Sequence, residues 1–358
     1  MTTDVQPTLP GRLGNPGMAL KDDPRADRRM LAAMVPFGLG EGAVPPPFSV
    51  DTPMEQLLEF CAGNEAGFEA VFGALAAQMP PVEGVTRSVE VIKGEDGNDI
   101  TLYIHRPTGA SGPLPGMLHI HGGGMVFLEA AGPLYCYWRD RLAASGMVIV
   151  GVEFRNAAGK HGVHAFPAGL NDCSSALHWI TANKAMLGIG KLIVSGESGG
   201  GNLTLATTLK ASRDGRIGEI DGVYAMCPYI SGAYANRPGS LTSLYENDGY
   251  FLEWVIMSLL AKVYDPGGAN TTNPLAWPWH ATPDDLRGLP PHVISVNELD
   301  PLRDEGLAYY RKLVDAGVSV TARTVNGTCH AGDVMFGMAM PDTIAATVRD
   351  IKGFADSL

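Results

Sequence analysis

From Gly116 onward, short apolar runs alternate with longer stretches whose apolar residues recur every three or four positions. The runs are MLHI (117–120), MVIVGVEF (147–154), KLIVSG (191–196), GVYAMC (222–227) and HVISVN (292–297). The stretches with helical spacing cover 134–145, 168–184, 202–213 and 303–316. Continuous β-rich runs indicate strands buried on both faces, and their alternation with helices indicates a parallel sheet. We therefore predict an α/β protein with a mostly parallel, doubly wound sheet flanked by helices.

The region before this alternation has a different character. Residues 1–50 are rich in Pro and Gly and have few periodic apolar positions, whereas residues 54–79 carry apolar side chains at helical spacing. The spacing then changes to two over residues 89–104, with turn-forming residues at 94–98, which predicts a β-hairpin.

A long insertion interrupts the alternation between Tyr229 and Asp285, where more than 50 residues rich in Tyr, Trp, Pro and Asn separate two strands. A connection of this length is commonly functional. We expect a catalytic core of residues 86–228 and 286–358. The N-terminal segment 1–85 and the insertion 229–285 are expected to form a helical cap over it.

Composition excludes several classes of protein. With 45% hydrophobic and 18% charged residues, the chain has enough apolar side chains for a large core. The net charge of -12, without any Lys/Arg cluster, disfavours a nucleic-acid partner. No apolar run reaches the roughly 18 residues of a membrane span, and the N-terminus lacks signal-peptide features, so we expect a cytoplasmic protein. Five cysteines without CxxC spacing suggest neither a disulfide framework nor a zinc site.

Ser198 is the centre of the motif GESGG (196–200), which matches G-x-S-x-G. In a chain with 45 glycines a chance match is a serious alternative. The motif, however, follows the strand-like KLIVS and precedes the helix-like GNLTLATTLKAS. A nucleophile elbow requires this strand–turn–helix context, with small residues flanking a strained serine.

A second glycine motif, HGGG (121–124), directly follows the buried strand MLHI. Consecutive glycines leave backbone N–H groups unobstructed, which suits an oxyanion hole; a merely flexible loop is the alternative. His119 and His121 form an H-x-H pair, but no third ligand is evident, so we predict no metal site.

A nucleophilic serine needs a histidine base. In folds with a nucleophile elbow, this histidine comes after the serine in the sequence. His280, His292 and His330 are the candidates. His292 begins a predicted buried strand and His280 lies in the insertion, so His330, in the loop after the strand VSVTARTV, is the predicted base.

The base in turn needs an acid, and three aspartates are open. Asp300 directly follows a predicted strand and precedes Pro301, and it is the leading candidate. Asp304, like Glu305, falls in the first turn of a helix, where carboxylates commonly just stabilise the N-terminus. Asp333 would have to reach back along its own loop to His330.

The motifs HGGGM (121–125), GESGGGN (196–202) and DPLRDE (300–305), with the late His330, resemble the hormone-sensitive-lipase-like family of α/β hydrolases over residues 87–350. The resemblance implies the α/β-hydrolase fold and a triad of Ser198, His330 and Asp300. It further implies Gly123, Gly124 and Gly199 as oxyanion donors, with Gly122 shaping the turn, and no cofactor or metal. The chain departs from the family in having Glu197 where many members carry Asp and Gly200 where many carry Ala.

The predicted function is a serine carboxylesterase that acts on short or medium acyl, aryl or lactone esters as its small-molecule partner. An amidase or deacetylase with the same triad is an alternative, and so is a non-catalytic ligand receptor, which the presence of His330 disfavours. Phe127, Leu128 and Trp254, with Tyr250, Phe251 and Met257, are candidate pocket residues; ordinary core packing explains them equally well. The sequence leaves the oligomeric state open, a homo-oligomer included.

Overall fold

The computed structural model describes residues 9–42 and 44–358, so the first eight residues of the predicted N-terminal segment lie outside it. In this range the chain forms an eight-stranded sheet in the order β1-β2-β4-β3-β5-β6-β7-β8. The strands are β1 (Val85–Lys93), β2 (Asp99–Pro107), β3 (Leu114–Ile120), β4 (Val148–Val152), β5 (Ile189–Glu197), β6 (Gly222–Met226), β7 (His292–Asn297) and β8 (Val320–Val325). β2 pairs antiparallel with β1 and β4, and the other pairs are parallel. The predicted mostly parallel α/β sheet is confirmed.

The apolar runs form the centre of this sheet. Every residue of β4, β6 and β7 is buried, as expected for strands covered on both faces. β1 lies at an edge and most of its residues are exposed, including the apolar Val89 and Val91, so its alternating sequence does not correspond to one buried face.

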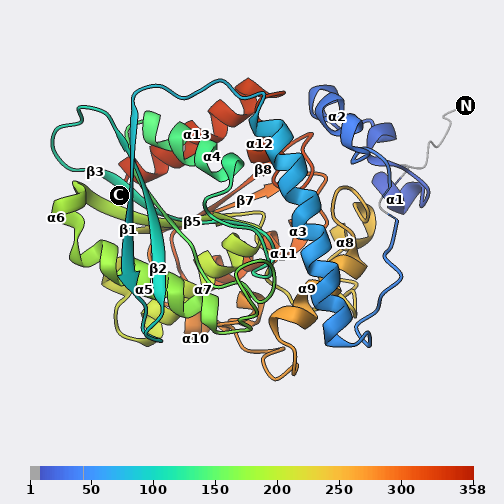
Figure 1. The fold of residues 1–358 in the computed structure, drawn as a ribbon. Coiled ribbons are helices and arrows are strands. Elements are labelled where there is room, and N and C mark those ends of the chain that lie inside the picture. Colours follow the sequence, from blue (N-terminus) through green and yellow to red (C-terminus); the bar gives the residue numbers. More distant parts are fainter. Residues whose placement is uncertain (1–8, 43) are drawn as a thin grey trace, which may run out of the picture.

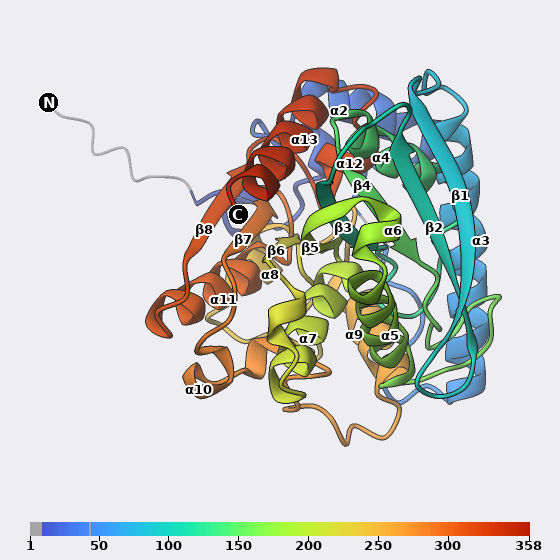
Figure 2. The ribbon, with the colours of Figure 1, turned by 90° about the vertical axis from the view of Figure 1, so that its left-hand side faces the viewer.

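Helices cover both faces of the sheet. Figure 2 shows α4 (Pro133–Ala144) and α13 (Pro341–Asp356) on one face, and α5 (Ala168–Ala182), α7 (Gly199–Arg213) and α11 (Arg303–Asp315) on the other. This is the doubly wound arrangement that the alternation of runs and helical stretches predicts. The short α6 (Lys184–Leu187) leads into β5.

The remaining helices come mainly from the N-terminal segment and the insertion. They are α1 (Gly11–Gly14), α2 (Arg28–Met34), α3 (Met54–Ala76), α8 (Ser243–Glu246), α9 (Trp254–Tyr264), α10 (Pro283–Leu286) and α12 (Gly332–Met335). Figure 1 shows α1, α2, α3, α8 and α9 gathered at one end of the molecule, and α3 packs against α9. The proposed division into core and cap stays a prediction. None of the helices in the described residues combines the length and apolar character needed to cross a membrane.

Candidate active site

Ser198 lies in a sharp turn between β5 and α7. Its backbone has φ 58° and ψ −120°, an unfavourable conformation for a residue with a side chain. A Cβ atom on Gly196 or Gly200 would lie 2.3 or 2.0 Å from the carbonyl oxygen of Ile120 in β3. The strand and helix that flank the serine therefore approach β3 so closely in this chain that a Cβ atom at either position would collide with backbone.

His330 and Asp300 bond to each other at the same edge of the sheet as Ser198. His330 Nδ1 lies 2.8 Å from Asp300 Oδ2, and both side chains are buried. The second carboxylate oxygen, Oδ1, accepts the N–H of Leu302 at 2.8 Å. The carboxylate is thus fixed by one backbone bond and orients the ring through the other oxygen. Ser198, Asp300 and His330 follow β5, β7 and β8, whose carboxyl ends meet at one sheet edge.

The competing acids contact other groups. Asp304 Oδ2 accepts the backbone N–H of Ser243 at 2.8 Å, and its Oδ1 lies 3.0 Å from Arg303. Asp333 accepts hydrogen bonds from an asparagine and a threonine side chain. Of the three aspartates that the sequence left open, Asp300 is the one bonded to His330.

The other two candidate histidines are also occupied elsewhere. His292 Nδ1 lies 2.6 Å from the Pro290 carbonyl, and burial lowers the pKa of its ring to about 4. His280 Nε2 lies 3.2 Å from the Ser231 carbonyl. Neither lines the pocket that contains Ser198.

The HGGG loop approaches the start of α7. Gly123 and Gly124 have φ values of 102° and 64°, which glycine adopts without strain. A Cβ atom on Gly199 would lie 2.7 Å from the backbone nitrogen of Gly124, so the two backbones are in direct contact. The N–H of Gly122 donates to Glu197 Oε1 at 2.7 Å and is therefore committed. Gly123 and Gly124 line the pocket beside Ser198.

Glu197 is a site residue that could be noted from the sequence only as a departure from the family pattern. Besides Gly122, this buried carboxylate contacts His119 Nε2, 3.3 Å from Oε2. His121 instead contacts the Gly122 carbonyl at 2.7 Å and stacks on Phe154, and burial lowers the pKa of its ring to about 3. The two histidines therefore face different partners.

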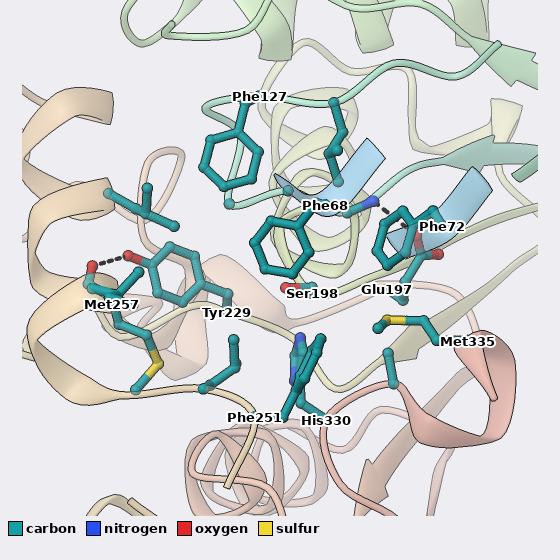
Figure 3. Close-up of a pocket in the computed structure, with 18 of the residues that line it drawn as sticks. Phe68, Phe72, Phe127, Glu197, Ser198, Tyr229, Phe251, Met257, His330 and Met335 are labelled. Carbon is teal, nitrogen blue, oxygen red and sulfur yellow. Dashed lines mark hydrogen bonds between the residues drawn. The ribbon is translucent and has the colours of Figure 1, made fainter. Parts of the chain in front are cut away.

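A pocket lined mainly by aromatic and aliphatic side chains surrounds Ser198 and His330 (Figure 3). Its cavity volume is about 80 Å³. Its side-chain walls include Phe68 and Phe72 from α3, Phe127 and Leu128 after the glycine loop, and Tyr229, Phe251, Met257 and Met335. Phe68 and Phe72 could not be identified as pocket residues from the sequence. Helical spacing indicates which face of α3 they occupy, but not which distant segment that face packs against.

Trp254, a predicted pocket residue, lies elsewhere in this structure. It is the first residue of α9 and does not line the cavity; its indole instead lies 5.2 Å from the guanidinium of Arg237. Tyr250 also lies outside, since its hydroxyl donates to Asp23 at 3.0 Å. The many aromatic residues of the insertion indicate that it contributes to the pocket wall. Which of these rings point into the cavity depends on the local backbone conformation.

Two groups in the described residues have potential metal ligands close together: Cys227 with Asp300 and His330, and Glu129 with Glu153 and His161. In the first, Asp300 and His330 bond to each other. In the second, the ammonium of Lys160 lies 2.8 Å from Glu129. Both groups thus have protein partners for their acidic oxygens.

Comparisons with known proteins agree with this geometry. A family model described as the alpha/beta hydrolase fold matches residues 117–333. A solved structure of brefeldin A esterase, described as a bacterial homologue of human hormone-sensitive lipase, is 47% identical, covers 98% of both chains and superposes with a TM-score of 0.95. Esterase Est22 with p-nitrophenol is 37% identical over 94% of this chain and 99% of its own, with a TM-score of 0.84.

A curated relative is also an esterase. The carboxylesterase NlhH of Mycobacterium tuberculosis is 31% identical over 273 residues, which are 74% of this chain and 81% of the relative. The resemblance of the HGGGM and GESGGGN motifs to the hormone-sensitive-lipase-like family is confirmed. The chain therefore belongs to the hormone-sensitive-lipase-like family of α/β hydrolases and is a carboxylic ester hydrolase.

Proposed function

We propose that the chain hydrolyses esters with Ser198 as nucleophile, His330 as general base and Asp300 as the acid that orients the base. The observation that carries this proposal is the bond of 2.8 Å between buried His330 and Asp300 beside the pocket that Ser198 lines. Because Nδ1 is held by Asp300, the ring presents Nε2 as the basic nitrogen.

In the first step, Ser198 Oγ attacks the ester carbonyl carbon while its proton passes to His330 Nε2. The negative charge that develops on the carbonyl oxygen is bound by the amides of Gly123, Gly124 and Gly199. Each donor of this kind contributes about 10²- to 10³-fold in rate. The start of α7 adds the positive end of a helix dipole.

The tetrahedral intermediate then collapses, and the proton on His330 passes to the departing alkoxide. The acyl group remains on Ser198 as an ester. Water attacks this acyl-enzyme while His330 takes its proton. The bond between the acyl carbon and Ser198 Oγ then breaks, the proton passes from His330 to Oγ, and the carboxylic acid is released. This sequence requires only the side chains and amides already named.

The substrates we propose are apolar esters with a short acyl or an aryl group. The pocket walls are aromatic, and a cavity of about 80 Å³ holds only a few water-sized groups. The related esterase Est22 was solved with p-nitrophenol, the alcohol of an aryl ester, which supports an aryl leaving group here.

Hydrolysis of p-nitrophenyl esters from acetate to laurate by the purified protein tests this function. We expect the highest kcat/KM with the short esters and a steep decrease toward laurate. Ser198→Ala is expected to lower kcat by at least about 10⁴-fold. Wild-type turnover by the alanine variant would refute the serine mechanism, and a maximum at laurate would refute the substrate range.

A further inference from the structure

Glu65 on α3 is a buried carboxylate whose partners lie far away in the sequence. Only 4% of its surface is exposed. Its Oε1 accepts the backbone N–H of Leu128 at 2.9 Å, and its Oε2 accepts that of Lys160 at 2.8 Å. A buried carboxylate is costly unless its oxygens are hydrogen-bonded, so these two bonds account for its retention in this position. Glu65 thus joins α3 to two loops of the α/β core.

The same face of α3 forms a wall of the active-site pocket. Phe68 and Phe72 follow Glu65 by three and seven positions, a spacing that places all three side chains on one helix face. Both rings line the pocket, and Phe68 stacks on Phe127 with ring centroids 5.9 Å apart. The contact of α3 with the segment after the HGGG loop therefore has an aromatic and a polar part.

Leu128 is the point at which this contact reaches the glycine loop. Its N–H is held by Glu65, its carbonyl accepts Asn156 Nδ2 at 2.7 Å, and its φ is 78°. The two residues before it donate their N–H groups to the carbonyl of Gly123 at 3.0 and 3.2 Å. A tight turn thus connects Leu128 rigidly to Gly123, so a shift of one displaces the other.

We propose that Glu65 is a positioning residue for the oxyanion hole. It holds Leu128, and through the turn that follows Gly123 it fixes the direction of the Gly123 and Gly124 amides. This inference rests on the proposed function, in which those amides bind the oxyanion. The N-terminal helix α3 then contributes to the rate of the chemical step as well as to the shape of the pocket.

The test is Glu65→Gln, which keeps the size of the side chain but replaces one acceptor oxygen with an NH₂ group. The NH₂ group would face the backbone N–H of Leu128 or Lys160. Because two donors repel each other, the loop that carries this N–H would move away from α3. Because a misplacement of about 1 Å can cost about 10²-fold, we expect kcat to fall about 10- to 100-fold with KM within about twofold. Rates are expressed per active site, titrated with an organophosphonate.

Glu69→Gln is the matched control. Glu69 lies one turn further along α3, and its Oε1 accepts a hydrogen bond from the side-chain ammonium of Lys160 at 2.6 Å. We expect wild-type kcat per titrated site. A wild-type kcat in Glu65→Gln, or an equal loss in Glu69→Gln, would overturn the proposal. A purely structural role would lower the melting temperature and the number of titrated sites but leave kcat per site unchanged.

Asn156→Ala provides a second variant if Glu65→Gln does not fold. It removes the opposite anchor of Leu128 without touching α3, and we expect the same loss in kcat with little change in KM. An unchanged kcat in this folded variant would overturn the proposal. The Ser198→Ala variant distinguishes a failure of the proposed function from a failure of the proposal for Glu65. If Ser198→Ala keeps wild-type turnover, the proposed function is wrong, whatever the effect of Glu65→Gln.

Discussion

The imidazole of His330 has one ring nitrogen committed to Asp300, and this contact determines what the ring can do. When Nδ1 carries the proton that it shares with Asp300, Nε2 is the unprotonated nitrogen, as the proposed role of His330 as base requires. The carboxylate itself is held by the N–H of Leu302, so the pair is oriented before a substrate enters.

Asp300→Asn is expected to lower kcat by about 10³- to 10⁴-fold while the protein stays folded. The amide keeps the shape of the carboxylate but favours the wrong ring tautomer. Steady-state kinetics with a p-nitrophenyl ester measure the effect. Asp304→Asn is the control, since Asp304 contacts Ser243 and Arg303 instead, and its kcat is expected to stay within about threefold of wild type. Equal losses in both variants would refute the assignment of Asp300.

Glu305 predicts a pH dependence of stability. Burial raises the pKa of this carboxyl to about 7, although Oε1 accepts Ile230 N–H and Tyr234 hydroxyl bonds. A carboxyl whose folded pKa is raised stabilises the fold below its unfolded pKa and loses that contribution as the pH rises through 7.

The unfolding free energy of wild type relative to Glu305→Gln is therefore expected to decrease by about 3 kcal/mol between pH 4.5 and 8. Urea unfolding of both proteins across this range gives the difference. A difference that does not change with pH would show that Glu305 titrates at the same pH in both states.

At the scale of elements, α7 and β3 meet through backbone rather than side chains. Gly200→Ala would place a Cβ 2.0 Å from the Ile120 carbonyl, so helix and strand must separate. We expect a loss of stability of about 3 kcal/mol, at the upper end for overpacked sites. Chemical unfolding checks this value, and stability at or above wild type would contradict the close approach.

Gly67→Ala in α3 is expected to have the opposite effect. An added Cβ meets nothing within 4 Å, and alanine favours a helix interior over glycine by about 0.5–1 kcal/mol. The melting temperature should therefore rise. A decrease would mean that α3 uses its glycine there for a contact that this structure does not contain.

Most of these helices and strands could be predicted because the spacing of apolar residues along the sequence shows which side of each element is buried. The strands at the centre of the sheet match the apolar runs, and α7 was predicted only from Asn202 because its first turn is glycine, which has low helix propensity. α13 was missed although Ile344, Val348, Ile351 and Ala355 form a buried stripe at helical spacing, a signal present in the sequence. The short helix α1 lacks such a stripe, and in α2 the stripe is limited to Met30, Leu31 and Met34, which is too short to predict a helix from spacing alone.

At the scale of the whole molecule, ion pairs connect the N-terminal segment to the insertion and to α11. Arg25 pairs with Asp23 and Glu246, and Arg303 pairs with Glu246 at 2.8 Å. Burial alone would raise the pKa of the Glu246 carboxyl, but hydrogen bonds from both arginines outweigh it and hold the pKa below its usual value. The stabilisation from this carboxyl is therefore present above pH 4.5 and lost as the pH falls.

Arg25→Met is expected to destabilise the protein by about 3 kcal/mol at pH 7, because it leaves Asp23 without its main partner and Glu246 with one arginine. The difference from wild type should shrink toward pH 3, because the pKa values of Asp23 and Glu246 are lowered from 3.8 and 4.5 and their carboxylates become protonated only as the pH falls through these lowered values. Urea unfolding at the two pH values measures both effects. A loss below about 0.5 kcal/mol would show that these segments pack together without the ion pairs.

The residues of the candidate active site could be predicted from the sequence where they directly follow strands. Ser198, Asp300 and His330 come after β5, β7 and β8, and the order of parallel strands brings such loops to one edge. Glu65, Phe68 and Phe72 reach the site from a helix about 130 residues before Ser198, and no local pattern indicates which surface that helix covers. The choice among aspartates likewise needed the observed contact with His330.

The most direct test of the proposed mechanism is to locate the covalent adduct formed by an organophosphonate ester. Intact-protein mass spectrometry followed by peptide mapping should show one phosphonyl group on Ser198, formed in step with the loss of hydrolysis of p-nitrophenyl acetate. The Ser198→Ala protein should remain unlabelled. Hydrolysis that persists after complete labelling of Ser198, or a stoichiometric adduct at another residue that abolishes activity, would contradict the account.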